Sequence, residues 1–189
     1  MTKGRKPKKN PFDKAMLPVI VLTVLTLSFL FLLKFFLQNE SNHTQYIQTG
    51  NTVPSFDLHP FQGKKVRYSD LNNKVVLMNF WASWCGSCII EMPSIIALRK
   101  KYLSKDFDVL FINLDEKPQS VIPSITKKMK IDFTQYVDVD GALTKIFNVH
   151  AIPFTVILDN QGKVLYIESG DRNWNSKEVH KKLDGWLSK

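Results

Sequence analysis

The chain has two cysteines, Cys85 and Cys88, separated by Gly86 and Ser87. They follow Val75–Trp81, a nearly continuous apolar run that is typical of a strand covered on both faces. A cysteine that follows such a strand at the N-terminus of a helix lies near unsatisfied N–H groups, which stabilise its thiolate and lower its pKa. A second cysteine one turn later can resolve a mixed disulfide. The spacing therefore predicts thiol–disulfide exchange, with Cys85 as the attacking sulfur.

Three other uses of this cysteine pair compete with redox chemistry. A structural zinc site needs about four ligands, and beyond the two cysteines the chain offers only scattered histidines. A purely structural disulfide between these positions would close a very short ring and gain little from loop entropy. Haem attachment would require a histidine directly after Cys88, where Ile89 stands. We therefore expect redox chemistry, with no metal and no bound cofactor.

The rest of the chain after residue 52 alternates strand-like and helix-like segments. Strands are expected at Phe56–Leu58 and Lys65–Tyr68 (a hairpin), Val75–Trp81, Phe107–Leu114, Tyr136–Asp138, Phe154–Leu158 and Val164–Ile167. Helices are expected at about 85–102, 118–129 and 142–147, with a last helix capped by Asn175 or Ser176 and ending at Leu187. This alternation predicts an α/β domain with helices on both faces of a sheet.

The N-terminus carries a second signal. Residues 15–33 contain no charge and, as a helix, would extend about 28 Å, close to the thickness of a bilayer's hydrocarbon core. The basic residues before this run predict a cytoplasmic N-terminus, and no cleavage pattern follows the run. We therefore expect a basic tail at 1–14, a transmembrane anchor at 15–37, a polar linker at 38–52 and a folded domain at 53–189.

The net charge of +9 is concentrated in the N-terminal segment. Residues 1–37 hold seven Lys or Arg and one acid, whereas residues 38–189 hold 19 Lys or Arg and 16 acids. Most of the basic excess is therefore an orientation and lipid-headgroup signal, and no nucleic-acid partner is expected.

Two segments carry a resemblance to a known family. Val75–Pro93, with its Trp-Cys-Gly-Ser-Cys sequence, and Val149–Thr155, with its Ile-Pro pair, resemble the thioredoxin superfamily and, more narrowly, the membrane-anchored TlpA/ResA-type disulfide reductases. The likeness covers residues 53–188 and includes an ending, Gly170–Trp174, that is suggestive of that group. It implies a thioredoxin-like fold with a central mixed sheet flanked by helices, an N-terminal hairpin and an inserted helix and strand at about 118–138.

The resemblance also implies roles for further residues. Pro153 would be a cis-proline facing the two sulfurs, presenting the backbone of Ile152 to a substrate peptide; the alternative is an ordinary proline at the start of a strand. Glu91 would be a carboxylate that transfers protons or tunes the cysteine pKa values; the alternative is a solvated helix charge. Trp84 is expected to be an exposed contact surface for substrate beside Cys85.

Two positions depart from thioredoxin. Asn79 stands where thioredoxin has a buried aspartate, and since an amide cannot take a proton, more weight falls on Glu91 as the base for Cys88. Ser87 replaces the usual proline between the cysteines, which leaves the reduction potential open.

These observations predict an extracytoplasmic enzyme that reduces disulfides in exported proteins. Its electrons would come from a transmembrane thiol carrier, and the resemblance suggests apocytochrome c as one substrate, although Phe154 after Pro153 departs from the Pro-Glu of dedicated cytochrome-maturation proteins. Two alternatives stay open: an oxidant that installs disulfides on the same fold, and a membrane-tethered binding or chaperone module without redox turnover.

Overall fold

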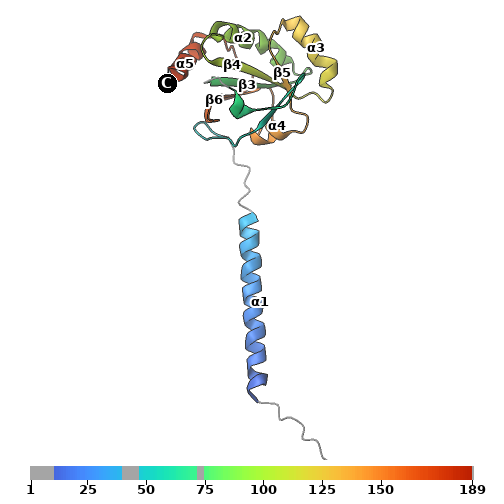
Figure 1. Cartoon of the computed structure of the whole chain (residues 1–189), viewed down its shortest axis with the longest axis vertical. Helices are drawn as coiled ribbons and strands as arrows, with labels where there is room; N and C mark the ends of the chain where they lie inside the picture. Colours follow the sequence, from blue (N-terminus) through green and yellow to red (C-terminus); the bar gives the residue numbers. More distant parts are fainter. Residues whose placement is uncertain (1–10, 40–46, 72–74, 189) are drawn as a thin grey trace, which may run out of the picture. The chain divides into compact units, whose positions relative to one another are not determined.

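The computed structural model describes residues 11–39, 47–71 and 75–188 and divides into an N-terminal helix and a folded domain (Figure 1). The first ten residues of the predicted basic tail and residues 40–46 of the predicted linker lie outside the described residues. The N-terminal unit is one helix, α1 (Pro11–Asn39). Over Pro18–Phe35 its mean hydropathy is 2.3 and none of its side chains is buried, so it is long and apolar enough to cross a membrane.

The domain is built on one mixed sheet in the order β2-β1-β5-β4-β3-β6-β7. The strands are β1 (Asp57–Pro60), β2 (Val66–Arg67), β3 (Val75–Trp81), β4 (Phe107–Asn113), β5 (Gln135–Val137), β6 (Phe154–Asp159) and β7 (Val164–Ser169). The central strands β3, β4 and β5 are parallel, while β6 runs antiparallel to β3. At the other edge, β1 pairs antiparallel with β2, as the predicted hairpin requires, and with β5.

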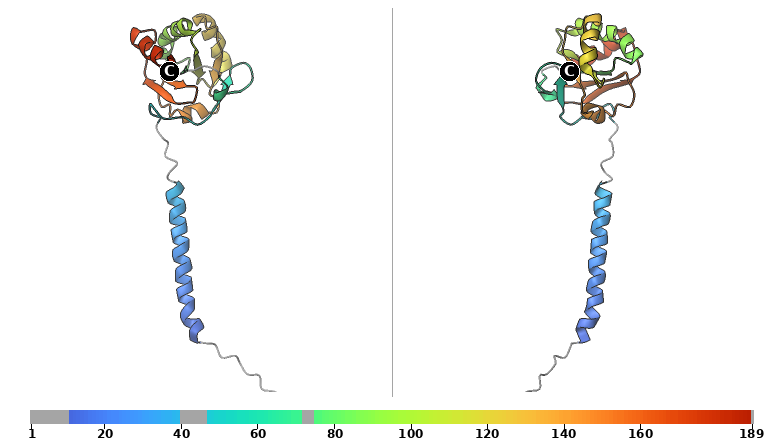
Figure 2. Two further views of the ribbon diagram at one scale, coloured as in Figure 1. Left: turned by 60° about the vertical axis from the view of Figure 1, so that its left-hand side comes forward. Right: turned by 90° about the vertical axis from the view of Figure 1, so that its right-hand side faces the viewer.

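Helices cover both faces of this sheet, as the alternation predicted (Figures 1 and 2). They are α2 (Gly86–Tyr102), α3 (Pro118–Met129), α4 (Ala142–Ile146) and α5 (Lys177–Leu187), with a short 3₁₀ turn at Tyr68–Asp70. Side chains of α2, α3 and α5 share one hydrophobic cluster, and those of α4 belong to the other. The thioredoxin-like fold, with its hairpin and its inserted α3 and β5, is confirmed.

Strand β3 is apolar along its whole length because it divides these two clusters. All seven of its residues are buried. Val75, Leu77 and Trp81 face α2, whereas Val76, Met78 and Phe80 face the α4 side. Asn79 alternates with Leu77 and Trp81 and so lies beneath α2. The buried side chains of α2 recur every three or four residues and so form an apolar stripe that packs on this face of β3.

The folded domain begins earlier than the predicted boundary at residue 53. Gly50 and Asn51 exchange backbone hydrogen bonds with Val164, and the amide of Val53 donates to the carbonyl of Gly162. This part of the predicted linker therefore belongs to the domain. It joins the sheet at the β6–β7 turn. Val75, at the start of β3, pairs with Asp159 at this turn, whereas Phe80, near the end of β3, pairs with Phe154. The chain therefore enters the sheet at the end opposite to the carboxyl end of β3.

The contact of α2 with the sheet gives a stability prediction. Leu98 lies on the face of α2 that packs on the sheet and is fully buried, whereas Ile90 on the same helix is 75% exposed. We expect Leu98→Ala to lower the unfolding free energy by about 2–5 kcal/mol, because it leaves a cavity in the core. Ile90→Ala, the matched control, should change it by less than about 0.5 kcal/mol. Equal effects in urea denaturation would contradict this packing.

Candidate active site

Both cysteines lie where β3 passes into α2, as the sequence predicted. They form a disulfide with a Cα–Cα distance of 5.3 Å. Cys85 is the N-cap of α2, and its sulfur accepts a hydrogen bond from the backbone amide of Cys88 at 3.2 Å. Cys85 is 6% exposed, whereas Cys88 is fully buried. The sulfur nearer to solvent is thus also the one that helix N–H groups can stabilise as a thiolate.

The loop before Cys85 is held by an aspartate from the neighbouring strand. Asp115 follows β4, and its carboxylate accepts hydrogen bonds from the backbone N–H and the hydroxyl of Ser83, both at 2.8 Å. The amide of Asn113 donates to the same carboxylate at 2.7 Å. Because β3 and β4 are parallel, their carboxyl ends meet at this edge, and the contact fixes the turn that presents Cys85.

Glu91 is buried one turn after Cys88, where its carboxylate is surrounded by donors. The side-chain amide of Asn79 donates to Oε1 at 2.7 Å. The indole N–H of Trp174 and the backbone N–H of Arg172 donate to Oε2, at 3.0 and 3.3 Å. The reading of Glu91 as a solvated helix charge is therefore wrong, since the residue is only 3% exposed.

Burial shifts the protonation of Glu91. Desolvation is the largest effect and raises the pKa of this carboxyl above its ordinary value of 4.5. The hydrogen bonds from Trp174, Asn79 and Arg172 lower it in part. A carboxyl with a raised pKa on the same helix face as Cys88 has the position and the chemistry of a proton acceptor or donor.

The segment between β7 and α5 closes over this carboxylate. Ser94 in α2 donates its hydroxyl to the carbonyl of Glu91 at 2.8 Å and accepts the backbone N–H of Trp174 at 3.0 Å. Trp174 is fully buried. The guanidinium of Arg172 turns outward to the carboxylate of Glu168 at 2.6 Å. The predicted family-like ending is therefore a structural part of the Glu91 environment.

Pro153 and Ile152 lie at the same end of the sheet as the cysteines. The Ile152–Pro153 peptide bond is cis, as expected. Pro153 directly precedes Phe154, which pairs with Phe80 near the carboxyl end of β3. Ile152 is half-buried and packs against the cluster that contains both cysteines. Its backbone N–H and C=O make no hydrogen bond to another described residue, so they are available for strand-like pairing.

The tryptophans before the cysteines have opposite environments. Trp81 is fully buried in the core, whereas Trp84 is 73% exposed. Ile90, which the sequence interpretation did not single out, is equally exposed on α2 two residues after Cys88. Two large apolar side chains are therefore exposed to solvent, one on each side of the cysteine pair in the sequence.

The sequence interpretation did not foresee how this site is supported: it did not name Asp115 or Thr155, and it named Trp174 only as part of the family-like ending. Asp115, Trp174 and Thr155 bind the Cys85 loop, Glu91 and Asn79, respectively. A signal for Asp115 was present, because polar side chains that follow neighbouring parallel strands meet at one edge of the sheet. The contacts of Trp174 and Thr155 depend on tertiary packing and have no local signal.

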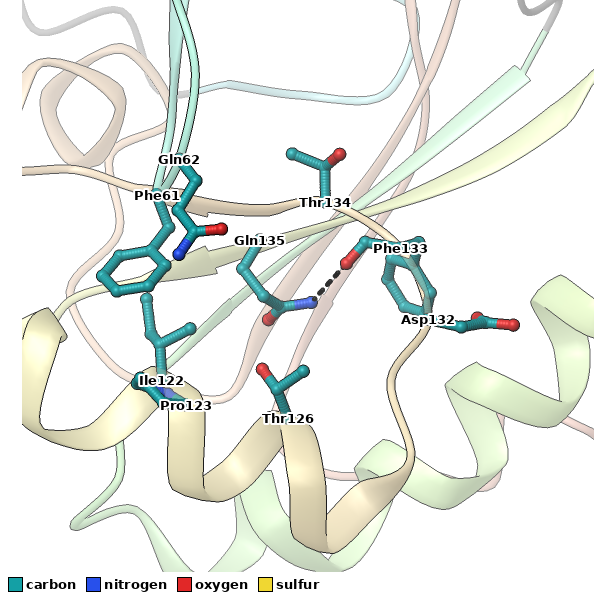
Figure 3. A pocket seen from close by; sticks show the side chains of 9 residues that line it. All are labelled: Phe61, Gln62, Ile122, Pro123, Thr126, Asp132, Phe133, Thr134 and Gln135. Atoms are coloured by element: carbon teal, nitrogen blue, oxygen red, sulfur yellow. Dashed lines mark hydrogen bonds between the residues drawn. The ribbon is translucent and has the colours of Figure 1, made fainter.

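A separate pocket of about 430 Å³ lies between α3 and the sheet edge (Figure 3). Phe61, Ile122 and Phe133 form its apolar walls, and Gln135 projects from β5 toward Thr126. None of the predicted site residues lines it. This pocket is therefore distinct from the disulfide.

Comparisons with known proteins agree with this geometry. The Redoxin family model matches residues 48–183. The thiol-disulfide oxidoreductase ResA of Bacillus cereus is 28% identical over 175 residues, which cover 93% of this chain and 97% of that protein. The thioredoxin-like protein YneN of Bacillus subtilis is 34% identical over 140 residues, covering 73% and 80%.

A solved structure shows the same fold. The crystal structure of a protein described as thiol:disulfide interchange protein DsbE, from Chlorobium tepidum, matches with a TM-score of 0.66 and 30% identity, covering 75% of this chain and 99% of that one. Together with the disulfide at the N-terminus of α2, these matches support thiol–disulfide oxidoreductase activity. The chain belongs to the Redoxin family, as a TlpA/ResA-type thiol–disulfide oxidoreductase of the thioredoxin superfamily.

Proposed function

We propose that this enzyme reduces disulfides in exported proteins through Cys85 and Cys88. The observation that carries the proposal is the disulfide at the N-terminus of α2, with the amide of Cys88 donating to the sulfur of Cys85. The Cys85 thiolate attacks a substrate disulfide, forms a mixed disulfide and releases one substrate thiolate. Cys88 then displaces the second substrate sulfur, so the Cys85–Cys88 bond forms and the substrate takes up two electrons.

Glu91 is the proton acceptor for Cys88 in this cycle. Cys88 must lose a proton before it can attack the mixed disulfide, and it is fully buried. Asn79 cannot accept that proton, whereas Glu91 lies one turn further along the same helix face with a raised pKa. A carboxyl that titrates closer to neutral pH exchanges a proton with a thiol more readily than an ordinary glutamate does.

Trp84, Ile152 and Pro153 form the substrate contact. The exposed ring of Trp84 offers apolar area beside Cys85, and Ile90 extends this area on α2. The unpaired backbone of Ile152 can align an extended peptide so that its sulfur reaches Cys85. Extended cysteine-containing segments, rather than folded surfaces, are the substrates that suit this arrangement, and apocytochrome c is one such protein.

The proposed location is the extracytoplasmic side of a membrane. The Pro18–Phe35 segment of α1 is strongly apolar, and Lys and Arg are frequent before it, which favours a cytoplasmic N-terminus and an exported domain. After each turnover the Cys85–Cys88 disulfide must receive two electrons. A transmembrane thiol carrier is the donor that we propose.

The direction of the reaction can be tested by the reduction potential. The full chain in detergent micelles is equilibrated with dithiol or glutathione buffers, and free thiols are counted by alkylation and mass spectrometry. We expect a value near that of thioredoxin, about −270 mV. A value near that of DsbA, about −120 mV, would overturn the proposal and favour the oxidant alternative.

The order of attack can be tested by trapping. We expect Cys88→Ser to accumulate a mixed disulfide between Cys85 and a disulfide-bonded peptide, because the resolving sulfur is missing. Cys85→Ser, its control, should form at least tenfold less, since Cys88 is fully buried. The reverse pattern on non-reducing gels would show that Cys88 is the attacking cysteine.

The raised pKa of Glu91 gives a pH prediction. Between the ordinary pKa of 4.5 and the raised pKa of the folded state, the folded protein binds more protons than the unfolded one. The stability from this group is therefore fully present below about pH 4.5 and is lost as the pH rises through the folded pKa. We expect Glu91→Gln to remove this loss in urea denaturation of the oxidised protein.

Glu178→Gln is the matched control for this measurement. Its hydrogen bond from Lys182 lowers the pKa of the exposed Glu178, so its contribution is lost in the opposite direction, as the pH falls. If Glu91→Gln and the unsubstituted protein lose stability equally with rising pH, the buried carboxyl is not the titrating group.

A further inference from the structure

Two groups under α2 lack hydrogen-bond partners. Among the described residues, three buried side-chain polar atoms have none: Asn79 Oδ1, Trp81 Nε1 and Gln135 Oε1. The first two lie on β3, two residues apart, on the face that α2 covers at the disulfide. An unsatisfied buried polar group destabilises a fold, so its position in a native structure calls for an explanation.

The orientation of the Asn79 amide follows from its neighbours. Its nitrogen donates to Glu91 Oε1 at 2.7 Å and to the hydroxyl of Thr155 at 2.9 Å. With both N–H groups used, the carbonyl oxygen points away from these two partners. Cys88 lies one turn nearer the N-terminus of α2 than Glu91 and, like Asn79, is fully buried on this side of the sheet.

We propose that Asn79 Oδ1 is the hydrogen-bond acceptor for the thiol of Cys88 in the reduced enzyme. The inference rests on the proposed redox cycle of Cys85 and Cys88. In the disulfide, the sulfur of Cys88 carries no hydrogen and cannot donate. Reduction by a dithiol breaks the S–S bond, adds two electrons and two protons, and gives Cys88 an S–H that can.

Such a hydrogen bond acts on one redox state only. It stabilises the dithiol form and leaves the disulfide form unchanged, so it shifts the equilibrium toward reduction and raises the potential. Asn79, which stands where thioredoxin has a buried aspartate, then has a function of its own. It is a positioning residue that sets how readily the enzyme gives up its electrons.

The first test compares reduction potentials of full-length variants in detergent micelles. We expect Asn79→Leu, which removes the acceptor, to lower the equilibrium constant for reduction about fivefold, which corresponds to about 20 mV. Thr155→Val is the matched control, because it removes a partner of the Asn79 nitrogen and leaves Oδ1 in place. An unchanged potential in Asn79→Leu, or an equal shift in Thr155→Val, would overturn the inference.

The same comparison in a Glu91→Gln background separates a direct effect from one through the carboxylate. A direct acceptor gives the same shift in both backgrounds. A shift that vanishes with Glu91→Gln would assign the effect to Glu91 and overturn the inference. If the unsubstituted pair does not exchange with dithiols at all, the proposed function fails instead.

A spectroscopic test does not depend on the stability of the leucine variant. In Cys85→Ser, Cys88 carries the one S–H of the chain, and its infrared stretch moves to lower frequency when the thiol donates a hydrogen bond. We expect the band to move to higher frequency when Asn79→Ala is added, and to stay in place when Thr155→Val is added. An S–H stretching frequency that does not change when Asn79→Ala is added would overturn the proposal.

Discussion

The burial of one carboxylate organises the active-site end of this protein. Glu91 is almost inaccessible to solvent, and a buried carboxylate is tolerable only where donors surround it. Here the donors come from β3 and from the segment between β7 and α5, so Asn79, Arg172 and Trp174 are tied to α2 through one side chain. These contacts add to the apolar packing of α2 on the sheet and link the turn of the helix after Cys88 to β3 and to the segment before α5.

A second set of contacts holds the loop on the other side of the disulfide. Asp115 binds the Ser83 backbone and hydroxyl, and Asn113 binds Asp115 in turn. The redox pair is therefore fixed from the β4 side through its preceding loop and from the β7 side through its helix. Trp84, between these supports, is left exposed, so an apolar ring in solvent stands beside a disulfide that is held from two sides.

Much of this could be predicted from the sequence. The β3–α2 junction, the hairpin and the inserted helix have local signals: a continuous apolar run, a Gln62-Gly63 turn and a proline at the start of α3. The cis-proline and the interest of Glu91 came from resemblance, because neither has a spacing rule of its own. The burial of Glu91 could not be foreseen, since it depends on Trp174, more than 80 residues away, packing against α2. The early start of the domain was missed because residues 48–53 pair through backbone groups, which leave no trace in side-chain composition.

That early start gives the domain a polarity. The chain joins the sheet beside the β6–β7 turn, whereas the cysteines, Pro153 and Trp84 gather at the opposite end of the strands. A force transmitted along the chain from its N-terminal side would therefore act on the end of the sheet opposite to the cysteines. The end of the domain that carries the sulfurs is therefore left clear of the segment through which the chain enters the sheet.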